Sequence, residues 1–474
     1  MGFAEAYLLK AGLRKALIEA KAHSGLKIIV TIPVYNESGL ERCLDSLFLC
    51  GCGAGAGEGA DAGADADADA GAAVGLDASA DADADADAEP AIAPDTDADF
   101  HAEVLILINA PEDAPREVQE QNQATLEASL KWIDSHRHPC IDFHVWLDHS
   151  FGKKEAGVGT ARKILMDEAV RRFSSLERPE GIVTGLDADA VVEANYLEAL
   201  VEHFSGDSSR PVPDGCSIRF EHPLSGNEND TEVYDAEVYE AITLYELHLR
   251  YYLQAQRSTS YPRAYHTVGS SMAVRADIYC LEGGMNRRKA GEDFYFIQKL
   301  AQRGNFSECN STCVRPSPRP SNRVPFGTGR AVSLFVKGED RLLTYHPEPF
   351  RMLGVLFSDI NALYSGPAAI SLLNQLPDIL KEFLESQDFD KALIEIRSNS
   401  SSLSAFRKRF WRWFTMFRIM KFLHFARERG FSDVPVGDAA SELLRTIDPE
   451  GTGIPSVAKD PKKLLLIYRM LDLR

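Results

Sequence analysis

The chain has 474 residues, of which 45% are hydrophobic, so two or three domains with buried cores are expected. Its formal net charge of −20 argues against a general nucleic-acid-binding protein. Residues 52–99 contain fourteen of the acidic residues and no Lys or Arg, so the remainder carries only −6, an ordinary charge for an enzyme surface.

The eight cysteines show no zinc-binding pattern, because neither Cys50 with Cys52 nor Cys309 with Cys313 has a matching second pair. We therefore expect free thiols and a cytoplasmic protein. The sequence contains neither a secretory signal nor a run of about 18 apolar residues that would predict a membrane span.

The predicted elements begin with an amphipathic helix within residues 1–23. The next elements are strands at 26–37, 103–110, 141–148 and 181–187, and helices at 39–50, about 115–135 and about 156–173. Alternating helices and apolar strands predict an α/β fold, in which a mostly parallel sheet has helices on both faces. Residues 51–99, rich in Ala, Asp and Gly, are expected to be a disordered insertion within this fold.

The carboxy-terminal part of the sequence reads differently. After a possible last strand at 342–346 the pattern is helical, so we expect a catalytic domain over 24–330 and a mainly helical region over 331–474. Residues 402–429 combine aromatic and basic side chains. This segment either packs on the catalytic domain or makes peripheral contact with the inner face of a membrane.

Two carboxylates, Asp187 and Asp189, follow the apolar strand at 181–187 in the stretch "GLDADA". Ligands of open α/β sheets bind at the carboxyl ends of the strands, and alternate residues of an extended segment point to one side. Two carboxylates arranged in this way suit Mg²⁺ or Mn²⁺. The similar repeats at 81–88 have no strand before them, so they lack this context.

A second acidic pair, Glu292 and Asp293, opens a helix in the stretch "GEDFYFIQKL". Acidic residues in a first helical turn often serve only to cap the helix. The functional alternative is a general base held on a rigid element.

Together, "VTIPVYNE", "GLDADAVVEANYLEAL" and "GEDFYFIQKL" resemble the motifs of family-2 glycosyltransferases of the GT-A fold. The resemblance covers residues 24–330, without the acidic insertion. It implies an inverting transfer of a sugar from a nucleotide-diphosphate donor to a glycan or lipid-linked acceptor. We expect a non-processive enzyme, because "RFWRW" has Arg409 where processive synthases have Gln, and no membrane span is predicted.

The same resemblance implies roles for individual residues. Asp189, with Asp187, would bind the metal, Asp293 would be the catalytic base, and Glu292 would lie near the acceptor. Arg162, in "GVGTARK", would approach the nucleotide. The nucleotide pocket would also include Asp187 and a set of residues at strand ends: Thr31, Pro33, Tyr35, Glu37 and Asn109.

Further candidates lie towards the carboxyl end. The loop 315–331 carries Arg315, Arg319, Arg323 and Arg330, and is either a lid over the diphosphate or a linker. His346 is a candidate third metal ligand, although a lone His at a strand end is more often structural. His266 is a weaker candidate for a position near the donor.

Two other functions remain open from the sequence. A sugar-nucleotide nucleotidyltransferase would need a Gly-rich basic loop after the first strand, where this chain has "PVYNESG". A non-catalytic nucleotide-sugar binding module would not need the acidic residues Asp187, Asp189 and Asp293.

Overall fold

The structure, a computed structural model, describes most of the chain. The described ranges are 2–12, 16–51, 100–152, 155–206, 211–226, 233–288, 290–323, 327–364, 366–448 and 460–473. The predicted insertion at 51–99 lies, apart from Gly51, outside these ranges.

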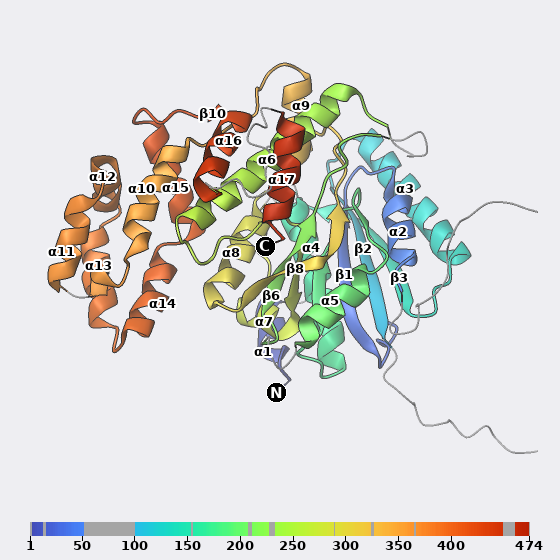
Figure 1. Cartoon of the computed structure of the whole chain (residues 1–474). Helices are drawn as coiled ribbons and strands as arrows, with labels where there is room; N and C mark the ends of the chain where they lie inside the picture. The colour runs from blue at the N-terminus through green and yellow to red at the C-terminus, as the bar shows by residue number, and fades with distance from the viewer. Residues whose placement is uncertain are drawn as a thin grey trace, which may run out of the picture.

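Eight strands form one mixed sheet in the order β3-β2-β1-β4-β7-β6-β8-β5 (Figure 1). Their bounds are β1 (Leu26–Val34), β2 (His101–Pro111), β3 (Ile141–Phe151), β4 (Ile182–Gly185), β5 (Val191–Val192), β6 (Gly215–Phe220), β7 (Met272–Arg275) and β8 (Phe306–Arg315). Strands β3, β2, β1 and β4 are parallel to one another, and β6 is parallel to β8. Strand β7 is antiparallel to β4 and β6, and β5 is antiparallel to β8. The parallel half is the part that the sequence predicted, and the antiparallel pairs make the sheet mixed.

Helices cover both faces of the sheet because the central strands are apolar on both sides. In β2, Val104 and Ile106 pack on the face covered by α2, α3 and α5, whereas Leu105 and Leu107 pack on the face covered by α4, α7 and α8. These helices are α2 (Leu40–Phe48), α3 (Arg116–Ser135), α4 (Val158–Ser175), α5 (Tyr196–Ser205), α7 (Ala276–Leu281) and α8 (Glu292–Arg303). The predicted α/β class with two covered faces is confirmed.

The carboxy-terminal region is helical, as predicted, and lies beside the sheet (orange to red in Figure 1). Its helices are α9 (Thr328–Val336), α10 (Pro347–Ser358), η1 (Ala362–Tyr364), α11 (Gly366–Gln375), α12 (Asp378–Ser386), α13 (Phe389–Ser398), α14 (Leu403–Trp413), α15 (Met416–Arg427), α16 (Val436–Ile447) and α17 (Pro461–Leu471). In the part of the chain that the structure describes, no helix is both long and apolar enough to cross a membrane.

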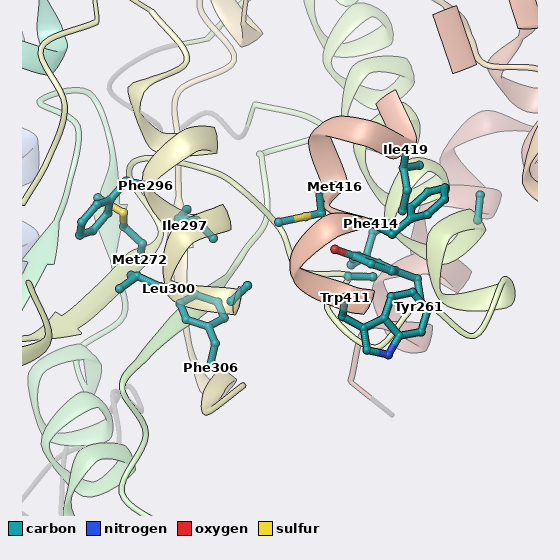
Figure 2. Close-up of a cluster of buried hydrophobic side chains, with 14 of the residues drawn as sticks. Tyr261, Met272, Phe296, Ile297, Leu300, Phe306, Trp411, Phe414, Met416 and Ile419 are labelled. Atoms are coloured by element: carbon teal, nitrogen blue, oxygen red, sulfur yellow. The ribbon is translucent and has the colours of Figure 1, made fainter. Parts of the chain in front are cut away.

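This helical region shares a hydrophobic core with the rest of the molecule. Figure 2 shows Tyr261, in the loop after α6 (Ala236–Ser258), beside Trp411 of α14, and their rings lie 5.4 Å apart between centroids. Helices α16 and α17 pack directly on α6. The boundary expected at residue 330 therefore falls inside α9 and does not separate two cores.

Three expectations need correction. The first helix is short, α1 (Glu5–Ala11), and residues 16–23 are not helical. The strand expected at 342–346 is β9 (Leu343–Thr344), which pairs with β10 (Val434–Pro435) in a separate two-stranded sheet. Cys140 is disulfide-bonded, whereas Cys309 and Cys313 are free.

Candidate functional site

The acidic stretch forms a turn directly after β4. The backbone N–H of Ala190 donates to the Asp187 carbonyl at 3.1 Å, so residues 187–190 turn and are not extended as the sequence suggested. The turn lies beside the end of β1, because Leu186 donates its N–H to the Thr31 carbonyl. The carboxylates of Asp187 and Asp189 are both partly exposed at this edge of the sheet.

Arg162 of α4 connects this turn to the start of α8. Its guanidinium donates to Asp187 and, through Nη1 at 3.1 Å, to Glu292 Oε1. The Arg162 side chain is buried, and it has room only because residue 269 is Gly. A Cβ on Gly269 would lie 1.7 Å from Arg162 Nη1. Three elements far apart in sequence thus meet at one buried guanidinium.

The acidic pair at the start of α8 divides into an inner and an outer residue. Glu292 is buried against Arg162, whereas Asp293 is half-buried and accepts the Phe294 N–H at 2.7 Å. Burial raises the Glu292 pKa to about 7 and also raises the Asp293 pKa, although the charge of Arg162 opposes both shifts. Asp187 contributes to both increases, so its carboxylate lies close enough to repel both. Glu292 therefore positions Arg162, and Asp293 is the acidic residue of this pair that has exposed surface.

Asp189 is the other half of the acidic turn and has an unfavourable electrostatic environment. Burial and the neighbouring Asp187 carboxylate raise the pKa of Asp189 to about 6. A divalent cation would relieve this repulsion, and carboxylate oxygens are the donors that Mg²⁺ and Mn²⁺ prefer. Two protein carboxylates suit such an ion when water and phosphate oxygens complete its shell.

Glu37, just after β1, makes contacts that the sequence did not reveal. It is buried and accepts hydrogen bonds from Arg319 and Arg323, and Arg319 also reaches Asp189 Oδ2 at 3.2 Å. Burial alone would raise the Glu37 pKa, but these two guanidinium groups lower it to about 2. Glu37 thus holds the arginine loop against the acidic turn.

The other predicted pocket residues occupy the ends of β1 and β2. Pro33 and Tyr35 are half-buried, and Tyr35 packs on Ala110 near the end of β2. Asn109 is 5% exposed, and its carbonyl accepts from Asn122. Thr31 is fully buried and donates its hydroxyl to the Thr184 carbonyl, so it is a core residue with no surface to offer a nucleotide.

The two candidate histidines make other contacts. His346 begins α10, where its Nδ1 accepts the Glu348 N–H and its ring packs on Phe431. His266 pairs with Asp472, just after α17, at 2.9 Å. Neither contact involves the acidic turn.

One three-residue group in the described ranges brings possible ligand atoms within 4.8 Å of one another: Glu103, Asp142 and His144. These residues lie near the amino ends of β2 and β3, at the sheet edge opposite the acidic turn. Glu103 is already paired with Arg172, and Asp142 with His101. Both carboxylates therefore already have a side-chain partner.

No model of a known protein family and no curated protein matches this chain. Among solved structures it is similar to residues 1–349 of S. aureus TarS, with 12% identity and a TM-score of 0.32, covering 94% of this chain and 92% of that one. The same fragment in complex with UDP-GlcNAc gives 13% identity and a TM-score of 0.34 over 94% and 92% of the two chains. The complex with UDP gives 13% identity and a TM-score of 0.33, covering 90% of this chain and 92% of that one. Likeness at this level carries no argument about activity.

Proposed function

We propose that this chain is a metal-dependent, inverting glycosyltransferase that moves a sugar from a nucleotide-diphosphate donor to an acceptor hydroxyl. The observation that supports it is the meeting of Arg162, Asp187 and Glu292 at the sheet edge where α/β folds bind ligands. Asp293 directly follows Glu292 in α8, which supports a position for it near the acidic turn. The acceptor class, a glycan or a lipid-linked sugar, comes from the sequence resemblance alone.

The leaving diphosphate gains negative charge as the bond to the sugar breaks. A divalent cation held by Asp187 and Asp189 would neutralise that charge. Arg162 keeps Asp187 in place, since its buried guanidinium pairs with that carboxylate and with Glu292.

Asp293 would remove the proton from the acceptor hydroxyl as it attacks. Its raised pKa brings it nearer to neutrality, where a general base transfers protons more effectively. Its place on the first turn of α8 fixes its position. Attack from the side opposite the leaving group inverts the sugar centre.

Replacing Asp293 with Asn keeps the shape of the side chain and removes the base. We expect Asp293→Asn to lower the transfer rate by about 10²–10⁴-fold, the usual contribution of a general base. Donor binding, measured as the increase in melting temperature with a nucleotide sugar and Mn²⁺, should persist.

Asp390→Asn is the matched control, because Asp390 is an exposed acid in the first turn of another helix, α13. It should leave transfer unchanged. Turnover near the native rate in Asp293→Asn would remove Asp293 from the mechanism.

A further inference from the structure

We propose that Arg319 is an internal counter-ion that competes with the divalent cation for Asp189, and that it transfers to the donor diphosphate when cation and nucleotide bind together. This inference rests on the proposed function, because it concerns the same carboxylates. It separates Arg319 from the other arginines of the loop.

Arg319 lies between two carboxylates. Its Nη1 donates to Glu37 Oε1 at 2.9 Å, and its Nη2 donates to Glu37 Oε2 and to Asp189 Oδ2. One guanidinium therefore bridges two carboxylates from different strand ends. A cation bound to Asp189 would lie beside this positive charge and be repelled by it.

The charges around Asp189 favour binding of the cation together with a nucleotide. Two carboxylates, Glu37 and Asp189, face two guanidinium groups, Arg319 and Arg323, and the neighbouring Asp187 pairs with Arg162, so each carboxylate of this cluster already has a cationic partner. A divalent cation alone adds two positive charges to it. A diphosphate brought with the cation offsets those charges, so cation and nucleotide should bind more tightly together than separately.

The Arg319 guanidinium can bind a phosphate as well as a carboxylate. Its planar fork of N–H donors matches phosphate oxygens as well as it matches a carboxylate. Arg319 therefore loses little when it leaves Asp189 for a diphosphate oxygen. Arg323 donates to the Tyr35 carbonyl at 2.8 Å as well as to Glu37, so it can hold Glu37 while Arg319 moves.

The backbone on either side of Arg319 donates few hydrogen bonds among the described residues. Pro318 and Pro320 flank it and have no N–H to donate, and the Arg319 N–H donates to the Ser317 hydroxyl at 3.3 Å. Two other arginines of the loop have partners elsewhere: Arg315 pairs with Glu193, and Arg330 bonds to Asn322.

Titration calorimetry of the full chain tests this inference with two probes, Mn²⁺ alone and UDP at saturating Mn²⁺. Arg319→Gln removes the competing charge, so Mn²⁺ alone should bind at least threefold more tightly, while UDP should bind at least tenfold more weakly. Arg319→Lys keeps the charge and loses the fork, so its Mn²⁺ affinity should stay near the native value while its UDP affinity falls. Arg330→Gln, on the same loop, should change neither.

Opposite changes in the two affinities are what a merely structural arginine would not produce. If Arg319→Gln leaves both affinities unchanged, or lowers both, the inference is wrong although the proposed function stands. If the native protein binds neither Mn²⁺ nor UDP, the proposed function fails and the inference with it.

Discussion

At the scale of single residues, the site depends on one buried guanidinium. Arg162 is 3% exposed and pairs with Asp187 and Glu292, so its position sets the distance between the acidic turn and α8. Such a paired, buried charge is costly to disturb, because the carboxylates left behind lose their partner. Gly269 is the neighbour that makes room for it.

Gly269→Ala tests this arrangement without touching a charged group. The new methyl would overlap Arg162 Nη1, so we expect the guanidinium to shift, with at least a tenfold loss of transfer activity and a loss of stability of about 1–3 kcal/mol. Activity assays and urea unfolding measure the two effects. The control is Gly437→Ala in α16, where nothing lies within 4 Å of the new Cβ. This substitution should lower neither activity nor stability. Native activity in Gly269→Ala would contradict the role given to Arg162.

Local sequence patterns predicted some of these residues and missed others. The positions of Asp187 and Asp189 after a strand and of Asp293 at a helix start were predicted, because periodicity locates these elements, and their roles stay predictions. The contact between Glu37 and Arg319 was not predicted, because the two residues are 282 positions apart and no local pattern pairs them. Thr31, a candidate for the nucleotide pocket, is fully buried, and the β-branched run around it gave no sign of this.

At the scale of elements, α14 and α15 support the packing interpretation of residues 402–429, and contact with a membrane stays a prediction. Phe406 and Phe410 are fully buried, and Trp413 and Phe417 are half-buried. The aromatic stripe therefore packs mainly inside the molecule. The helical spacing predicted the helices, but not that the chain turns between Trp413 and Met416.

Phe410→Ala measures how much this packing contributes. We expect a loss of about 3–5 kcal/mol in the free energy of unfolding, because the substitution leaves a cavity among aromatic rings. Urea unfolding gives the value, and Lys408→Ala, an exposed change on the same helix, should stay within about 0.5 kcal/mol of native. A loss below about 1 kcal/mol in Phe410→Ala would show that α14 does not pack as described.

At the scale of the whole molecule, the α/β part and the helical region are joined by one core and by a polar network around α17. Asp472, just after α17, accepts hydrogen bonds from Arg250 and Gln254 of α6 and from His266. The alternation of strands and helices predicted the parallel half of the sheet and its covered faces. The antiparallel pairs made by β5 and β7 were missed because these strands are only two and four residues long.

In the proposed function, nucleotide and metal bind together at the acidic turn. Calorimetric titration of the native chain with UDP, GDP, ADP and CDP, each with Mn²⁺ and with EDTA, measures this. We expect one nucleoside diphosphate to bind at least tenfold more tightly with Mn²⁺, and Asp189→Asn to abolish that difference, because the cation loses a ligand. Equal affinities with Mn²⁺ and with EDTA, or an Asp189→Asn variant that keeps the full metal effect, would contradict the account.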